Sequence, residues 1–267
     1  MRALFRGNWR GIMLPAAMLG AFALLITPEV SDAAKDQGPK ATFIKGDVEH
    51  GPSAEGPFKR LKKKRKVPVG NFVKTGDGAR AELKFPDGSV VRIGPASMLH
   101  VAATGFNGKT KEVKVEANVV GGKVWANVSK MVGSEAKFQV KTENAVAGVR
   151  GTVFRVNLDQ DKATVVKVYN GAVAVSNSPF FANQSADNSS GVGPIRKDRV
   201  QIAAPYEKVN KKEFEEIVER MMVVRVGADG AMSKPAPFTL EDEKKDEAEA
   251  EWINWNLSCD QGSCSDF

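Results

Sequence analysis

The sequence is poor in the residues that most often build metal sites and nucleophilic active sites. Only two cysteines and two histidines occur among its 267 residues. His50 and His100 lie far in the sequence from Cys259 and Cys264, so a site with four zinc ligands is not expected. The chain also lacks the Gly-x-Ser-x-Gly, His-Glu-x-x-His and phosphate-loop motifs. We therefore expect a protein that is not an enzyme and needs no cofactor.

The two cysteines stand close together, in the segment Cys-Asp-Gln-Gly-Ser-Cys near the end of the sequence. In an oxidising compartment such a pair predicts a small disulfide loop between Cys259 and Cys264. The closed loop is short, so its entropic contribution to stability is modest. We expect this disulfide to restrain the end of the chain and little else.

One long apolar run occurs, at the start of the sequence. Three arginines precede it, residues 11–27 carry no charge, and the small residues Ser31 and Ala33 follow. This order predicts that residues 1–33 are a secretory signal peptide cut after Ala33. An uncleaved anchor is the alternative, although the run is slightly short for a membrane span. Both interpretations place the rest of the chain outside the cytoplasm, in the periplasm or envelope of a bacterium.

Charge is distributed unevenly along the remainder. Residues 35–178 hold 25 Lys and Arg against 13 Asp and Glu, whereas residues 179–267 hold 11 against 17. A basic domain therefore precedes an acidic tail. Such a domain suits anionic lipid head groups, wall polymers or nucleic acid, but the tail could equally cover the basic face of its own protein.

Residues 40–177 have the pattern of a domain made of short strands. Residues 81–85 and 113–119 alternate apolar and polar side chains, as half-buried strands do. Pro86-Asp87-Gly88 predicts a turn between strands, and Asn170-Gly171 predicts a tight hairpin. The fold class is therefore mostly β, either a stack of short strands resembling a solenoid or a sandwich.

A weak internal echo runs through this domain. Gly46-Asp47-Val48, Gly122-Lys123-Val124 and Gly171-Ala172-Val173 each place a glycine turn before a strand. Their spacing is irregular, so we predict no regular repeat from them.

The pattern changes after residue 177. Residues 178–206 are rich in Asn, Ser and Gly and predict a linker. Residues 207–267 predict a helical, acidic extension. Within it, residues 207–224 have helical periodicity, and residues 239–257 form a second helix that Thr239 caps. Trp252 and Trp255 lie three positions apart, so one face of that helix can dock on the domain.

The densest group of positive charges lies near the start of the β domain. It predicts an exposed loop between strands, and the functional alternative is contact with an anionic polymer or a membrane surface. Few aromatic residues lie nearby, which argues against single-stranded nucleic acid as the partner. The candidate contact residues are Lys59, Arg60, Lys62, Lys63, Lys64, Arg65 and Lys66.

A second motif comprises Gly148, Arg150, Gly151 and Thr152. Here the arginine stands between glycines within an apolar stretch. A buried arginine needs polar partners, so we expect Arg150 to fix loops through carbonyls or a carboxylate. A role in ligand binding is the alternative.

Taken together, the motifs resemble the FecR domain, named for the periplasmic part of the iron-dicitrate signalling regulator. The resemblance covers roughly residues 40–177. It rests on residues 45–48 (Lys-Gly-Asp-Val), 69–81, 85–93, 122–124, 140–142, 149–152 and 170–173, in that order.

The resemblance implies a β-rich periplasmic domain that works by protein contact. In the regulators an anti-sigma region precedes the membrane span, but only about ten residues precede the apolar run here. Direct contact with a sigma factor is therefore not expected. We expect an exported protein that binds unidentified envelope proteins, in signal sensing or scaffolding, or alternatively a module for an anionic wall or surface polymer.

Overall fold

The computed structural model describes residues 38–106, 113–130, 137–177 and 215–264. The predicted signal peptide (1–33), the predicted linker (178–206) and the first part of the predicted helix (207–214) lie outside these residues. Within them the chain is mostly β, with two helices near its C-terminal end. The predicted fold class is confirmed.

Eight strands form sheet A, and all neighbours in it are antiparallel. In spatial order they are β1 (Lys40–Lys45), β5 (Arg80–Lys84), β6 (Val90–Ile93), the second half of β8 (Val113–Asn127), β11 (Val153–Leu158), β12 (Thr164–Asn170), β15 (Met222–Val226) and β16 (Ala236–Pro237).

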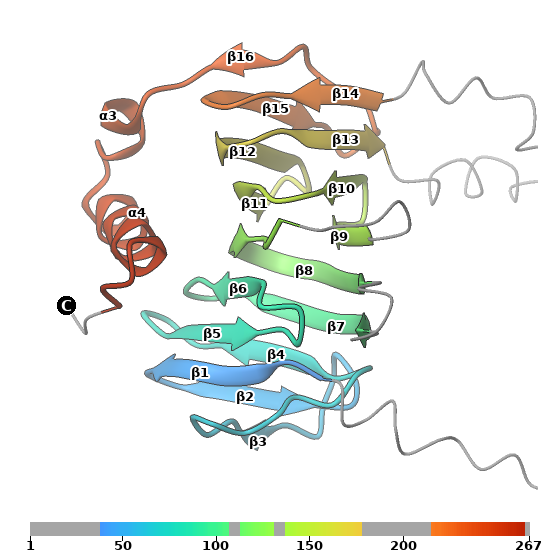
Figure 1. Cartoon of the computed structure of the whole chain (residues 1–267), viewed down its shortest axis with the longest axis vertical. Coiled ribbons are helices and arrows are strands. Elements are labelled where there is room, and N and C mark those ends of the chain that lie inside the picture. The colour runs from blue at the N-terminus through green and yellow to red at the C-terminus, as the bar shows by residue number, and fades with distance from the viewer. Residues whose placement is uncertain (1–37, 107–112, 131–136, 178–214, 265–267) are drawn as a thin grey trace, which may run out of the picture. The chain divides into compact units, whose positions relative to one another are not determined.

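Sheet B lies against sheet A. Its order is β3 (Lys59–Arg60), β2 (Val48–Gly51), β4 (Phe72–Thr75), β7 (Met98–Phe106), the first half of β8, β9 (Lys137–Lys141), β10 (Ala145–Val149), β13 (Val173–Asn177) and β14 (Glu215–Val218). Only the β8–β9 pair is parallel among the described strands. Figure 1 shows the strands stacked from β1–β3 at one end to β14–β16 at the other.

A single apolar core fills the space between the two sheets. Leu83 and Val91 reach it from sheet A, and Leu99 and Phe138 from sheet B. Each of these side chains is at most 2% exposed. Strict alternation along the strands produces this core, because every second side chain points inward.

The chain repeatedly crosses from one sheet to the other, and glycines lie at several of these corners. The long strand β8 pairs with β7 up to Gly121 and with β11 from Gly122 onward. The weak sequence echo is thus a set of corners, since Gly46, Gly122 and Gly171 all have positive φ. The Asn170-Gly171 hairpin was predicted wrongly: β12 belongs to sheet A and β13 to sheet B.

The predicted helix over residues 207–224 is also wrong where the structure describes it. Residues 215–218 and 222–226 form β14 and β15, joined by a turn at Met221, whose φ is 59°. Val218, Val224 and Val226 are buried in the main core. Their β-branched side chains suit a pleated sheet, and pairing with β12 and β13 outweighs the helical spacing. The sheets therefore extend beyond the predicted limit at residue 177.

Two helices follow the last strand. Helix α3 (Leu240–Glu243) has Thr239 as its N-cap, as predicted, and α4 (Glu247–Asp260) is capped by Asp246. The single helix predicted over residues 239–257 is therefore wrong, because the chain leaves the helical conformation at residues 244–246 and starts a second helix. Figure 1 shows α4 beside the sheets rather than within the stack. Neither of these described helices has both the length and the apolarity that a membrane crossing requires.

Candidate functional site

The outer face of sheet A carries a set of basic side chains. Along β5, Ala81 and Leu83 enter the core, so Arg80 and Glu82 face outward. The same alternation turns one basic residue outward on each of four neighbouring strands. The five residues are Arg80, Arg92, Lys123, Arg155 and Lys167, from β5, β6, β8, β11 and β12.

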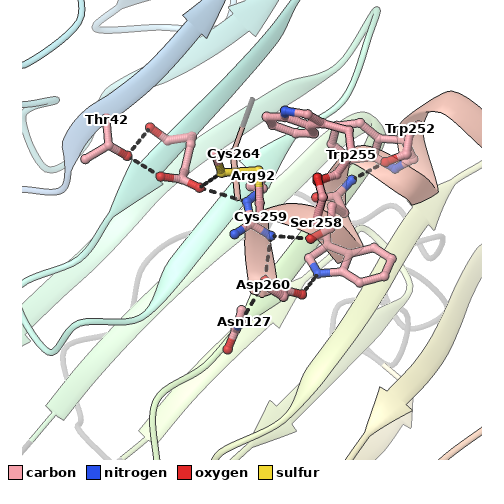
Figure 2. Close-up of polar contacts among 12 residues, drawn as sticks. Thr42, Arg92, Asn127, Trp252, Trp255, Ser258, Cys259, Asp260 and Cys264 are labelled. Atoms are coloured by element: carbon pink, nitrogen blue, oxygen red, sulfur yellow. Dashed lines mark hydrogen bonds and ion pairs between the residues drawn. A yellow bond between two sulfur atoms is a disulfide. The ribbon is translucent and has the colours of Figure 1, made fainter. Parts of the chain in front are cut away.

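The last residue of α4 binds the centre of this face. Oδ1 of Asp260 lies 2.7 Å from Nη1 of Arg92 and accepts a hydrogen bond from Asn127 at 2.8 Å. Its other oxygen accepts from Nε1 of Trp125 at 2.9 Å. Nε of Arg92 donates to Glu82 at 2.8 Å, so this buried guanidinium lies between two carboxylates (Figure 2). One aspartate thus joins α4 to two strands.

Further carboxylates hold the upper part of the helical segment. Glu249 pairs with Lys123 and with Arg155, whose Nη2 lies 2.7 Å from Oε2. Burial alone would raise the pKa of Glu249, but the charges of Arg155 and Lys123 outweigh burial and lower it. Glu243 pairs with Nζ of Lys167 at 2.6 Å. The acidic helices therefore neutralise the basic face, one of the two roles that the charge distribution allowed.

A second, aromatic core lies beneath these ion pairs. Trp252 and Trp255 of α4 are each 1% exposed and pack with Phe43, Trp125 and Tyr169 of sheet A. The rings of Trp125 and Tyr169 stack with centroids 4.1 Å apart. The predicted docking of one face of this helix is confirmed. Burying two tryptophans contributes several kcal/mol, of the order of 2–3 each, so α4 is an integral part of the fold.

Tyr169 belongs to the aromatic core and also takes part in the polar contacts of the helices. Its hydroxyl donates a hydrogen bond of 2.7 Å to Oε2 of Glu243. Burial raises the pKa of Tyr169 far above its usual value, and Arg155 counteracts this only in part. The phenol therefore stays protonated and acts as a donor beneath α3.

The predicted basic run lies at the β1–β3 end of the stack. Lys59 and Arg60 form β3, Leu61 is buried as an anchor, and the side chains of residues 62–66 are exposed. The backbone of the run is nevertheless fixed. The amide of Ala41 donates to the carbonyl of Arg65 at 2.8 Å, and the amide of Lys64 donates to the carbonyl of Ala41 at 2.7 Å. The run is therefore an edge of the fold whose backbone is hydrogen-bonded to β1 and whose side chains are exposed, rather than a loose loop.

His50 lies near this edge. Burial lowers the pKa of His50, and the charges of Lys59 and Arg65 lower it further. The imidazole is therefore neutral at physiological pH, and it bonds Asn71 at 3.1 Å. The two positive charges thus add to the effect of burial on the pKa of His50.

Arg150 does not occupy the predicted environment. Its side chain is exposed, because β10 ends at Val149 and the next residues turn the corner toward sheet A. The prediction of a buried arginine is wrong. Gly151 does need to be glycine: its φ is 75°, and an added Cβ would lie 3.1 Å from Cα of Lys130. Thr152 is buried and donates to the carbonyl of Ala172 at 2.8 Å.

Gly148, the remaining member of that motif, lies within β10. A Cβ there would meet only the carbonyl oxygen of Ala174, at 3.9 Å. The structure therefore gives this glycine no special role. The motif forms a corner of the fold between β10 and β11.

A buried polar network was missed by the sequence analysis. Asn144 is fully buried, and its amide donates to the carbonyls of Lys162, Val226 and Gly227 at 3.1, 2.9 and 2.6 Å. Its oxygen accepts from Thr142 at 3.0 Å. Asn144 thus ties three separate loops together. No local pattern predicts these partners, since they lie up to 83 residues away.

Cys259 and Cys264 are joined by a disulfide with an S–S distance of 2.06 Å. Together with Glu82 they make up a group of potential metal ligands within the described residues. The sulfur atoms are consumed by the disulfide, and Glu82 binds Arg92 and Thr42. The group therefore does not fit a metal ion.

An open cleft of about 690 Å³ follows the edge of the stack where several corners meet. Its lining includes Ala96, Val120, Gly121, Leu158 and Lys162. Val120 is 46% exposed. Among the described residues, Ile217 is the other large apolar side chain that is exposed. The cleft could accommodate an apolar group of a partner.

Residues 71–174 match the family model described as FecR protein. The chain carries a FecR domain. The matched segment begins just before β4 and ends in β13, so the FecR domain comprises the middle of both sheets. The basic run lies before the matched segment, and the acidic helices lie after it.

Two similar solved structures are crystal structures of a proposed anti-sigma factor from Parabacteroides distasonis. Each is 17% identical, and each match covers 62% of this chain and 59% of the other, with TM-scores of 0.41 and 0.40. The match thus spans about three-fifths of their length. The comparison with curated proteins gives no match.

Proposed function

We propose that this chain is an exported, non-enzymatic protein of the bacterial cell envelope that senses or relays a signal, or scaffolds, through protein contacts. The FecR domain over residues 71–174 carries the proposal. A direct sigma-factor contact is not part of it. The outer face of sheet A is occupied by α3 and α4, so partners would use the outer face of sheet B or the edge cleft.

Photo-cross-linking in living cells tests this function. A cross-linking amino acid would be placed at Val120 in the cleft and, in separate variants, at Gln139 on sheet B. A matched variant carries it at Trp252, which belongs to α4 and is buried against sheet A. We expect discrete adducts from the first two positions and none from the third. A chain that yields no specific adduct from either surface would contradict the proposal.

Export is tested separately by N-terminal sequencing of the mature chain. The expected first residue is Ala34, because Ala33 ends the predicted signal peptide. A chain beginning at Met1 in the membrane fraction would favour the anchor instead.

A second candidate function is binding of an anionic wall or surface polymer. The exposed, rigid run of residues 59–66 favours it, since its charges project from a fixed backbone. Loss of polymer binding as salt is raised would support a charge-driven site.

A further inference from the structure

The disulfide encloses the residue that joins α4 to sheet A. Cys259 and Cys264 close a short ring, and Asp260 lies inside it as the last residue of α4. Cys259 is buried in the aromatic core, whereas Cys264 is exposed and its sulfur lies 3.7 Å from Oε2 of Glu82. Glu82 and Asp260 are the two carboxylates that bind Arg92. The cross-link and the contact that positions α4 therefore belong to one cluster (Figure 2).

The last turn of α4 needs support from outside the helix. Asp260 places a negative charge at the C-terminal end, where the helix dipole is itself negative, and residues 257–260 include no basic side chain to offset it. Backbone hydrogen bonds of 3.0 and 2.9 Å, from the amides of Gly262 and Ser263, close the turn. These bonds do not relieve the repulsion between the carboxylate and the dipole. The position of Asp260 thus depends on its ion pair and on the cross-link.

The sulfur of Cys264 is open to a reductant, because Cys264 is exposed and Cys259 is only 8% exposed. A thiolate of a dithiol reductant would attack the Cys264 sulfur and form a mixed disulfide, and Cys259 would leave as a thiolate that takes up a proton. The second thiol of the reductant would then break the mixed disulfide and release Cys264 as a thiol. Two electrons pass from the dithiol to the protein, which gains two thiols while the reductant becomes a disulfide.

Loss of the Asp260 contact affects three partners on sheet A. Besides Arg92, Asp260 accepts hydrogen bonds from Asn127 and from Nε1 of Trp125. Arg92 is 3% exposed and Trp125 is fully buried, so both would keep a polar group away from water without this carboxylate. A buried donor without an acceptor is costly, and so is a buried charge that loses a partner. Entry of water between α4 and sheet A relieves both costs, so release of Asp260 favours opening of the contact.

We propose that the disulfide between Cys259 and Cys264 is a redox-sensitive switch of the helical segment. In the oxidised chain it holds Asp260 on Arg92 and keeps the end of α4 docked. Its reduction by a dithiol releases this end from sheet A and exposes part of the aromatic and basic face that α4 covers. The inference goes beyond the proposed function and does not depend on it.

Hydrogen exchange followed by mass spectrometry tests the switch. The purified chain would be measured in its oxidised form and after reduction with dithiothreitol. Amides of residues 256–260 should exchange about tenfold faster in the reduced chain, because the restraint of the ring and a buried ion pair are lost together. Amides of β11, whose Phe154 and Val156 lie in the main core, should exchange at an unchanged rate.

Two substitutions at neighbouring exposed positions make the test specific. Cys264→Ser removes the cross-link and leaves the buried Cys259 in place, so this variant should exchange like the reduced parent with or without dithiothreitol. The matched control Ser263→Ala keeps the disulfide and should behave as the oxidised parent does. Circular dichroism should show both variants folded, and the reduced parent gives the same comparison without any substitution.

A third variant tests whether the disulfide acts through Asp260. Oxidised Asp260→Asn should exchange at α4 as fast as the reduced parent, and its reduction should add little, because both changes remove the same contact. Additive effects would show that the cross-link acts independently of Asp260 and would contradict the assignment. Unchanged exchange of α4 in the reduced parent would mean that the disulfide restrains only the chain end, which overturns the switch. Equal acceleration in β11 would overturn it as well, since general destabilisation would then explain the result.

Discussion

At the scale of single residues, two positions hold the corners of the stack. Asn144 joins three loops through its amide, and Gly122 allows β8 to pass from sheet B to sheet A. Both act where chain segments far apart in the sequence meet. Substitutions at these positions test the corners directly.

Replacing Asn144 by Ala should lower the free energy of unfolding by about 1–3 kcal/mol, because three backbone carbonyls, that of Val226 buried, lose their donor. Urea denaturation of the purified chain measures this change. The control Asn254→Ala alters an exposed side chain of α4 and should stay within about 0.5 kcal/mol of the parent. Equal stability of the two variants would refute the role of the network.

Replacing Gly122 by Ala should destabilise more than replacing Gly230 by Ala. Both glycines have positive φ, 77° and 79°. An added Cβ at Gly122 would lie 2.7 Å from Cα of Ser97, whereas nothing lies within 4 Å at Gly230. The backbone strain is thus matched, and the difference of about 1–3 kcal/mol reports overpacking at the corner. Thermal melts measure the difference. Equal melting temperatures of the two variants would contradict the prediction and show that the corner relaxes around the added Cβ.

At the scale of elements, α4 is the part whose behaviour depends most on charge. Its carboxylates meet the outward cations of sheet A, and its tryptophans fill the aromatic core. The ion pairs set the position of the helix, and the apolar burial supplies most of its stability. Two predictions concern this element.

Replacing Asp260 by Asn should destabilise the chain by about 3 kcal/mol, since Arg92 is buried and would lose one of two carboxylates. Asp242→Asn is the matched control, because Asp242 is exposed in the first turn of α3. The midpoint of urea unfolding should fall for the first variant only. Parallel shifts in both would show that general charge, rather than the Arg92 contact, is responsible.

Acid should loosen α4. The pKa of Glu249 is lowered in the folded chain, so this residue contributes stability above its ordinary pKa of about 4.5. That contribution is lost as the pH falls through the lowered value. Fluorescence of Trp252 and Trp255, followed from pH 7 downward, should report exposure of the indoles below about pH 4.5. Glu249→Gln should weaken this dependence, and an unchanged acid profile would contradict the assignment.

At the scale of the whole molecule, two basic surfaces serve different purposes. The cations on the outer face of sheet A pair with carboxylates of α3 and α4, whereas the side chains of residues 62–66 at the β1–β3 end are exposed. The net charge of the whole domain does not distinguish these two basic surfaces. Stability measurements can distinguish them, because only the first contributes to folding.

Replacing Lys62, Lys63, Lys64 and Arg65 by Ser should leave the melting temperature unchanged or slightly raise it. The side chains are exposed and repel one another, while the turn is held by backbone hydrogen bonds. Differential scanning calorimetry of variant and parent measures the difference. A fall of many degrees would show that the charges themselves support the fold.

The local sequence pattern alone was enough to predict several features of the fold. Alternation identified the β class, and Pro86-Asp87-Gly88 identified the β5–β6 turn. Thr239 identified the start of α3, and the tryptophan spacing identified the docked face of α4. Each of these depends on neighbours a few residues apart. The sequence therefore contains enough information for them.

Only the tertiary structure decided which segments pair. Residues 215–226 became strands because β12 and β13 offered open edges, and Asn170-Gly171 became a corner because its two strands belong to different sheets. The exposure of Arg150 has the same origin. These features arise from contacts between residues far apart in sequence, whose partners the local pattern does not contain.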